Sequence, residues 1–211
     1  MGKTALLSAL KFLFPPLCWH CNEPAPFSHS LCSACLAFLA PLSSSSDPLI
    51  TFEGEGPAWT LIQALRSGKA PHLAEGLAGY MALQLLHSHH PLPDFIIPVP
   101  QSLFRSLQIG YNPRYLLAHH LGKILNRPVL SLLKRSPQLL RQTQLPLDRR
   151  RLLSASHFQW RKPFPLHEKT ILLVDDLIGT GATLRCCAQR LNEAFPLKII
   201  KMAAVRQNLI G

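Results

Sequence analysis

Residues 171–183 read ILLVDDLIGTGAT, and this stretch decides the expected fold. The four apolar residues at its start are typical of a strand that is buried on both faces of a parallel sheet. Two adjacent aspartates, Asp175 and Asp176, follow at the carboxyl end of that strand, where α/β sheets bind their ligands. Buried carboxylates are unfavourable unless something binds them, so the pair predicts a ligand that carries hydroxyl groups or a metal ion.

The loop after the aspartates is rich in small residues and leads into a predicted helix at 180–195. The first turn of a helix presents unpaired N–H groups and the positive end of the helix dipole, so it favours a phosphate. The phosphate-binding candidates are Gly179, Thr180, Gly181, Ala182 and Thr183. The aspartates would accept hydrogen bonds from vicinal ribose hydroxyls, directly or through a hydrated divalent cation. The loop matches neither the dinucleotide pattern G-x-G-x-x-G nor a P-loop. The alternative is an ordinary strand–turn–helix with a polar cap, which the two adjacent acids and the loop after them disfavour.

Helical and strand patterns alternate along the rest of the chain. The spacing predicts strands at 94–100, 128–135, 169–176 and 197–206 and helices at 57–68, 72–88, 112–125 and 180–195. Such alternation indicates an α/β fold in which a parallel sheet is flanked by helices. The stretch PLSSSSDP at 41–48 is typical of a linker, so we predict two domains, residues 1–46 and residues 47–211.

Four of the six cysteines form two C-x2-C pairs, CWHC at 18–21 and CSAC at 32–35. Two such pairs complete a tetrahedral set of four thiolates, which suits zinc better than magnesium or calcium. The predicted zinc ligands are Cys18, Cys21, Cys32 and Cys35. Two disulfides are the alternative, and the reducing cytosol expected for this chain disfavours them. Cys186 and Cys187 lie in a helical stretch and are expected to be buried structural thiols.

The chain is strongly basic: its 211 residues include 22 Lys and Arg against 11 Asp and Glu, a formal net charge of +11. Such an excess favours polyanionic partners, among them nucleic acid and phosphorylated small molecules. Basic residues crowd between Lys134 and Lys162, with interleaved aromatic side chains that could stack on unpaired bases. The candidate DNA-binding residues are Arg149, Arg150, Arg151, Trp160, Arg161 and Lys162. The alternative is a basic face that is merely solvated.

No apolar run approaches the roughly 20 residues that a membrane span needs. The N-terminal stretch MGKTALLSALKFLF resembles the start of a signal peptide, but Lys11 interrupts it and no small-x-small cleavage site follows before Pro15-Pro16. We therefore expect an amphipathic helix there, and a cytoplasmic protein.

Taken together, these motifs resemble those of the ComF family, a competence-associated branch of the type I phosphoribosyltransferases that includes GntX. The matching pieces occur in the family's order: CWHC and CSAC, ALRSGK (64–69), IIPVP (96–100), Arg105, GYN (110–112), LLAHHLG (116–122), QTQL (142–145), Arg150, Phe158 and VDDLIGTGAT (174–183). The similarity spans nearly the whole chain. Its most specific part is the double cysteine pair combined with the PVP stretch and the acidic pair before the TGAT loop.

The resemblance implies a phosphoribosyltransferase-like parallel sheet with an N-terminal double zinc-knuckle module. It also implies that Asp175 and Asp176 hold the ribose of phosphoribosyl pyrophosphate (PRPP), that residues 179–183 hold its 5′-phosphate, and that Arg105 lies in a loop above the site. The implied cofactors are a structural Zn²⁺ and a Mg²⁺ bound with PRPP, and the implied partners are PRPP, single-stranded DNA and a competence helicase. Two functions stay open: a PRPP-binding protein that supports DNA uptake in natural transformation, and an active phosphoribosyltransferase of nucleotide or nucleobase metabolism.

Overall fold

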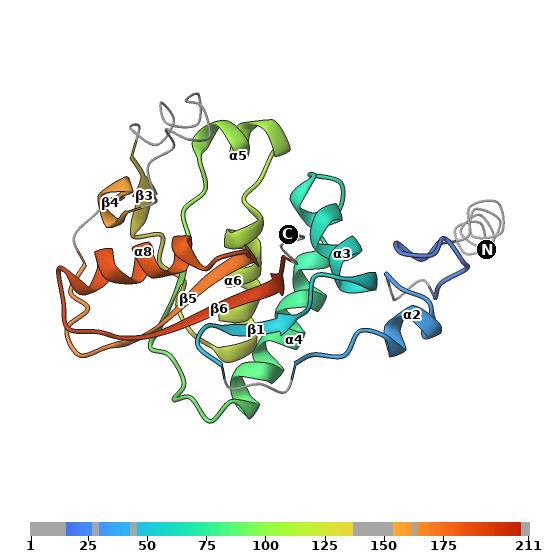
Figure 1. Cartoon of the computed structure of the whole chain (residues 1–211), viewed down its shortest axis with the longest axis horizontal. Helices are drawn as coiled ribbons and strands as arrows, with labels where there is room; N and C mark the ends of the chain where they lie inside the picture. The colour runs from blue at the N-terminus through green and yellow to red at the C-terminus, as the bar shows by residue number, and fades with distance from the viewer. Residues whose placement is uncertain (1–15, 27–29, 43–45, 137–153, 162–163, 208–211) are drawn as a thin grey trace, which may run out of the picture.

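The computed structural model describes residues 16–26, 30–42, 46–136, 154–161 and 164–207. Its central feature is a four-stranded sheet (Figure 1). In spatial order the strands are β1 (Leu49–Phe52), β6 (Lys198–Arg206), β5 (Thr170–Ile178) and β2 (Phe95–Pro98). Each neighbouring pair runs parallel, which confirms the predicted parallel sheet.

Helices cover both faces of this sheet, as predicted (Figure 1). They are α3 (Gly56–Arg66), α4 (Leu73–His87) and α6 (Pro113–Leu125) on one face and α8 (Ala182–Asn192) on the other. In β5, Leu172 and Val174 pack with the first group, whereas Ile171 and Leu173 pack with α8. Because successive side chains of a strand point to opposite faces, an unbroken apolar run is needed to fill both cores.

A second, antiparallel pair of strands packs against α8. It consists of β3 (Leu133–Arg135) and β4 (Phe158–Trp160), and η2 (Ala155–His157) precedes β4. The strand predicted at 128–135 is therefore only partly right, because Val129 makes a single bridge to Ile96 before the chain leaves the sheet. Pro128 has no N–H group, so this segment can add few hydrogen bonds to the sheet edge beside β2.

Other boundaries also differ from the predictions. β5 continues to Ile178 because β6 keeps pairing with it as far as Arg206, so the aspartates lie inside the strand rather than just before the loop. The helix predicted at 180–195 is the shorter α8. Strand β1 was not predicted, and neither was the short helix α5 (Leu103–Ile109), which projects away from the sheet (Figure 1).

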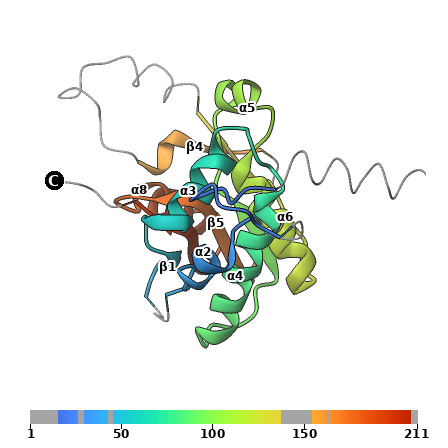
Figure 2. The ribbon, with the colours of Figure 1, turned by 90° about the vertical axis from the view of Figure 1, so that its right-hand side faces the viewer.

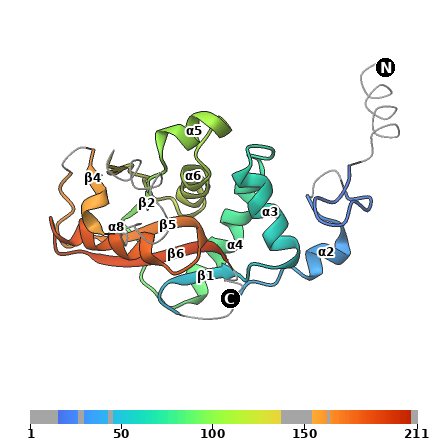
Figure 3. The ribbon, with the colours of Figure 1, turned by 45° about the horizontal axis from the view of Figure 1, so that its top comes forward.

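The N-terminal cysteine segment packs beside α3 and α4 (Figures 2 and 3). It contains α2 (Ser33–Ala37) and an isolated antiparallel bridge between Leu17 and Pro24. Cys18 shares one hydrophobic core with Leu61 of α3 and Leu77 of α4. The segment therefore does not stand apart from the helices, and a domain boundary between residues 46 and 47 stays a prediction.

No helix in the described part of the chain is both long and apolar enough to span a lipid bilayer. The amphipathic helix expected at the N-terminus falls outside the described residues.

Candidate ligand-binding site and metal centre

An acid pair lies near the carboxyl end of β5, where Asp175 and Asp176 are each only 3% exposed. Asp175 continues the row of side chains that faces α8, and Asp176 continues the row that faces α3 and α6. The backbone holds both carboxylates: the N–H of Asp176 donates to Oδ1 of Asp175 at 2.9 Å, and the N–H of Leu177 donates to Oδ1 of Asp176 at 2.9 Å. The orientation of the acids is thus set by the strand itself.

Two arginines from distant parts of the chain neutralise this pair. Arg114, in the first turn of α6, places its Nε 2.6 Å from Oδ1 of Asp175 and 3.0 Å from Oδ1 of Asp176. Arg66, the last residue of α3, places Nη1 3.2 Å from Oδ2 of Asp176. A single guanidinium therefore bridges carboxylates that point to opposite faces of the sheet. It can do so because β2 ends at Pro98 and leaves the side of β5 open there.

Burial and these cations give the two acids different proton affinities. Burial raises the pKa of Asp175 to about 7, the neighbouring Asp176 adds to this, and Arg114 opposes it. Burial also acts on Asp176, but Arg114 and Arg66 outweigh it and hold the pKa of that carboxyl well below its usual range. Close to neutral pH the pair therefore combines a firmly ionised acid with one that can hold a proton.

Two more arginines lie close to the acid pair. Arg135 of β3 donates from Nε to the carbonyl of Pro100 at 3.1 Å, and Arg114 donates to the same carbonyl at 3.2 Å. Arg105, on the exposed helix α5, is near enough to feel the charges of Arg66, Arg114 and Asp176. Burial lowers the pKa of both Arg105 and Arg135, and neighbouring arginines lower it further. The site therefore holds more positive charge than its two carboxylates compensate.

Of these arginines, only Arg105 was predicted as a ligand-binding residue. The roles of Arg66 and Arg114 were missed, and Arg135 was counted only as one of the cations in the basic stretch. One signal was available: Arg114 lies in the first turn of a predicted helix, next to the positive end of the helix dipole, where a cation is unfavourable without an acidic partner. This position could have suggested that Arg114 pairs with the buried acids.

The loop at 179–181, which begins three residues after Asp176, presents unpaired backbone donors. Within the described part of the chain, the N–H groups of Gly179, Thr180 and Gly181 donate to no acceptor. Gly181 has φ 73° and caps α8, and a Cβ there would come 3.2 Å from Nη1 of Arg185. That guanidinium is held by the carbonyl of Thr180 at 2.7 Å. The loop thus keeps its amides available for an anion, as its sequence predicted.

A cavity of about 250 Å³ opens beside this loop. Its lining includes Gly179, Thr180 and Gly181 together with three cations, Arg185, Lys201 and Arg206. Two of these cations already have acidic partners: Lys201 lies 2.8 Å from Asp47, and Arg206 lies 3.2 Å from Glu53. Of the other predicted phosphate-binding residues, Ala182 and Thr183 form the first turn of α8, where Ala182 donates its N–H to Oγ1 of Thr180 at 3.4 Å.

The acid pair is a poor direct site for Mg²⁺. This ion takes octahedral oxygen ligands at about 2.0–2.1 Å and usually uses one or two carboxylates. Three of the four carboxylate oxygens already accept from N–H groups or pair with arginine, and Nε of Arg114 lies between the two acids. A cation bridging Asp175 and Asp176 would have to displace that guanidinium.

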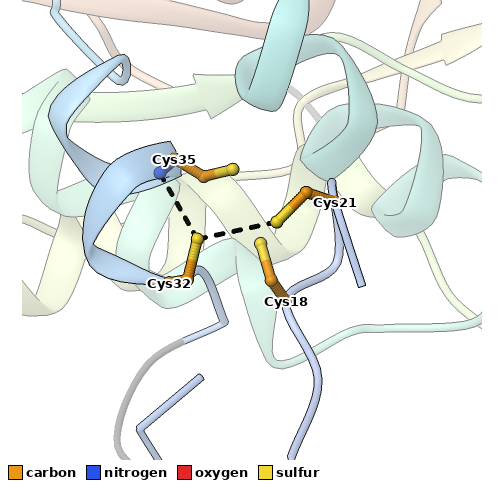
Figure 4. A group of neighbouring side chains, drawn as sticks. All are labelled: Cys18, Cys21, Cys32 and Cys35. Atoms are coloured by element: carbon orange, nitrogen blue, oxygen red, sulfur yellow. Dashed lines mark hydrogen bonds between the residues drawn. The ribbon is translucent and has the colours of Figure 1, made fainter. Parts of the chain in front are cut away.

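The four cysteines of the predicted zinc site converge (Figure 4). Their sulfur atoms all lie within 4.8 Å of one another, and Sγ of Cys21 is 3.6 Å from Sγ of Cys32. Zinc–thiolate bonds are about 2.3 Å long in a tetrahedral arrangement, which requires sulfur atoms at about this spacing. The N–H of Cys35 donates to Sγ of Cys32 at 3.5 Å, as a helix N-cap. The cluster could therefore hold a metal ion such as zinc.

The thiols of this cluster differ in acidity. Burial and the side chains of the neighbouring cysteines raise the pKa of the Cys35 thiol. A backbone hydrogen bond at Glu23 lowers the pKa of the Cys21 thiol, but burial and the side chain of Cys18 outweigh it, so that pKa is raised too. Burial raises the pKa of the Cys18 thiol, but backbone N–H groups of Cys21, Cys32 and His20 outweigh it and lower that pKa to about 6. Cys186 and Cys187 on α8 are buried, as predicted, and burial raises the pKa of both thiols. Among the described cysteines, only the N-terminal four lie close enough together to hold a metal ion, and Cys18 supplies a thiol of lowered pKa to that group.

The candidate DNA-binding residues are only partly described. Arg149, Arg150, Arg151 and Lys162 lie outside the described residues. Trp160 is half-buried, with its ring edge-on to Phe195 at a centroid distance of 6.0 Å. Arg161 is exposed and donates from Nε to the carbonyl of Leu133 at 3.2 Å. Phe158 is fully buried, so it anchors β4 to the core and is not available to stack on unpaired bases.

Comparison with known proteins identifies relatives along most of the sequence. No family model matches the chain. It is 31% identical to the DNA utilization protein YhgH of Escherichia coli O157:H7 over 183 residues, covering 83% of this chain and 77% of that protein. It is 30% identical to competence protein F of Haemophilus influenzae over 178 residues, covering 80% of this chain and 75% of that protein. The chain belongs to the family of competence protein F. This confirms the resemblance to the ComF family.

Solved structures with some likeness to this ComF family member include phosphoribosyltransferases. Adenine phosphoribosyltransferase from Saccharomyces cerevisiae superposes with a TM-score of 0.45 at 14% identity, over 66% of this chain and 72% of that one. A hypoxanthine-guanine phosphoribosyltransferase from Bacillus anthracis gives a TM-score of 0.40 at 13% identity, over 66% of this chain and 82% of that one. Because these TM-scores are low, we judge the function from the geometry of this chain and from its sequence relatives.

Proposed function

We propose that this chain binds PRPP at the acid pair, the loop at 179–183 and the surrounding arginines, and that it acts in DNA uptake or utilization. One observation carries the ligand part: a buried acid pair, four arginines and a loop with unpaired N–H groups occur together near the carboxyl end of one parallel strand. PRPP needs these three kinds of group, because it combines ribose hydroxyls, a phosphate and a diphosphate.

Each part of the site suits one part of that ligand. Carboxylate oxygens have lone pairs left after pairing with arginine, so Asp175 and Asp176 can still accept from vicinal ribose hydroxyls. The loop amides and the first turn of α8 suit the 5′-phosphate. Arginine suits the diphosphate because its planar fork can donate two hydrogen bonds to one phosphate group. A Mg²⁺ ion, which the family resemblance implies, would arrive with the diphosphate rather than with the acids.

The proposed role with DNA rests on the relatives and on charge. The relatives are named as a DNA utilization protein and as a competence protein. The net charge of +11 favours a polyanion, and single-stranded DNA is the form on which interleaved aromatic side chains such as Trp160 could stack. A competence helicase as partner and a cytoplasmic location stay expectations from the family resemblance. We also propose that the four-cysteine cluster holds a structural Zn²⁺.

Saturating PRPP is expected to raise the melting temperature (Tm) of the wild-type chain by roughly 5–10 °C, since a ligand at a hundred times its Kd adds about 2.7 kcal/mol to stability. Asp175→Asn combined with Asp176→Asn should abolish the shift, because an amide offers one neutral acceptor oxygen where an ionised carboxylate offers two charged ones. The measurement is a thermal-shift titration in which each variant is compared with its own Tm without ligand.

Two variants at exposed positions serve as controls, because they should not disturb the fold and so report on PRPP binding alone. Arg105→Gln changes an exposed residue of the site, so the protein should stay folded and the shift should shrink. Glu193→Gln changes an exposed acid at the far end of α8 and should leave the shift intact. A full PRPP shift in the Asp175/Asp176 variant would contradict the proposed site.

Single-stranded DNA binding should weaken steeply with salt, and Arg149→Ala, Arg150→Ala and Arg151→Ala together should flatten that dependence. The slope of log affinity against log salt should fall by about 2, since each neutralised phosphate of a single strand contributes about 0.7. The matched control removes three exposed lysines elsewhere, Lys123, Lys169 and Lys198. Its loss of net charge is the same, so an equal change in slope would show that this segment has no special role in contacting DNA.

A further inference from the structure

The acid pair of this site already contains a cation of its own. Arg114 contacts both carboxylates, at 2.6 Å and 3.0 Å, and Arg66 contacts Asp176 at 3.2 Å. Arg114 is also held by the carbonyl of Pro100 at 3.2 Å, and its side chain is only 13% exposed. A guanidinium with this many partners stays in place, so it occupies the position from which a divalent ion would bridge the acids.

The arginines also leave positive charge over for an anion. Arg66, Arg105, Arg114 and Arg135 surround two carboxylates, so with both acids ionised the described part of the site carries two more positive than negative charges. The side chain of Arg105 donates no hydrogen bond to any described residue. Burial and arginine neighbours disfavour the charged forms of Arg105 and Arg135, and a bound anion would relieve this repulsion.

A divalent ion has one electrostatic task at a diphosphate, which is to neutralise charge so that the ligand can enter a partly buried site. Guanidinium groups perform the same task when they are preorganised and close together, and they add directional hydrogen bonds. Here the surplus guanidiniums come from α5 and β3, whereas α3 and α6 supply those that neutralise the acids.

We propose that this site binds a diphosphorylated pentose such as PRPP without requiring a divalent cation, because its four arginines neutralise the acid pair and offset most of the charge of the diphosphate. The inference rests on the proposed PRPP site and departs from the Mg²⁺ dependence that the family resemblance implies. It makes ligand binding sensitive to these arginines and insensitive to the concentration of free Mg²⁺.

Isothermal titration of PRPP into the wild-type chain, with millimolar Mg²⁺ and without divalent ions, tests this directly. Ligand and buffer are freed of metal on a chelating resin, because a chelator added to the protein would also attack the four-cysteine cluster, and bound zinc is measured in the same samples. The two affinities should agree within about fivefold, which is roughly 1 kcal/mol. A larger loss without Mg²⁺ overturns the inference and leaves the PRPP site standing, whereas an absence of binding in both conditions overturns both.

The variant Arg66→Gln tests whether the arginines are the reason why PRPP binds without Mg²⁺. Arg66 is 20% exposed and touches Asp176 from the edge of the site, so its loss should be tolerated by the fold. The variant should bind PRPP about tenfold more weakly without divalent ions and should recover part of that affinity with Mg²⁺. Arg190→Gln, which changes an arginine paired with Glu193 at the far end of α8, should behave like the wild type. If Arg66→Gln keeps the wild-type affinity without Mg²⁺, the arginines do not replace the ion and the inference fails.

Discussion

Arg114→Met is expected to lower the free energy of unfolding by about 3–5 kcal/mol, because it leaves two buried carboxylates without the cation that they share. The side chains of Asp175 and Asp176 are each only 4% exposed, so the little water that reaches them compensates poorly for the loss of the guanidinium. Methionine has a similar length and fills much of the same volume, so the loss reflects charge rather than a cavity. Urea unfolding measures the effect, and the Tm should fall on the order of 10 °C.

A compensating variant separates this electrostatic cost from loss of packing. Arg114→Met combined with Asp175→Asn and Asp176→Asn should recover much of the stability, since replacing a whole buried charge cluster is often close to neutral whereas removing one partner is not. The control is Arg190→Met, which breaks an exposed pair with Glu193 at 2.7 Å and should change stability by less than about 0.5 kcal/mol. If Arg114→Met unfolds like the wild type, the acid pair does not depend on this arginine.

Three of the four strands of the central sheet, β2, β5 and β6, could be predicted from the sequence because they obey a simple physical rule. A strand such as β5 that is covered on both faces must be apolar at successive positions, and ILLV shows this directly. The end of that apolar run also lies near the carboxyl end of the strand, so the position of the two acids close to that edge of the sheet was predictable. The small residues of the loop also indicated free amides, and Gly181 does adopt the left-handed conformation that suits glycine.

The arginines of the site could not be predicted in this way, since they meet the acids only through tertiary structure. Arg114 is separated from Asp176 by 62 positions and Arg66 by 110. No local periodicity encodes such a contact. Helix α5 was missed for a different reason: it has only 7 residues, which is too short for a helical period to be recognised in the sequence. Its apolar side chains Leu103, Phe104 and Leu107 have helical spacing but are strongly exposed.

The cysteine pairs differ from the arginines, because their spacing in the sequence predicted that they form a cluster. This prediction did not need any helix or strand around the cysteines to be recognised. Two thiols in a C-x2-C pair can turn toward one ion whatever the fold, because the constraint is local. The contact of this cluster with α3 and α4 was not predictable, and it changes what the metal is expected to do. Since Cys18 belongs to the same core as Leu61 and Leu77, metal binding should stabilise those helices as well as the cysteine segment.

Removal of the Zn²⁺ proposed for the four-cysteine cluster is therefore expected to lower the Tm of the whole chain by more than about 10 °C, because structural zinc contributes its binding energy to folding. We expect about one Zn²⁺ per purified chain. Cys21→Ser should lose most of it, and Cys21 is exposed, so this change removes a ligand without opening a cavity in the core. Metal analysis and thermal unfolding with and without a chelator measure both effects.

Cys186→Ala provides the matched control, since it removes a buried thiol of α8 that lies outside the cluster. It should retain its zinc and respond to the chelator as the wild type does. Hydrogen exchange then locates the effect: in Cys21→Ser the amides of α3 and α4 should exchange faster, because they share a core with Cys18, while those of α8 should be unchanged. Faster exchange confined to residues 16–39 would instead show that the cysteine segment folds independently, as the predicted boundary after residue 46 implies.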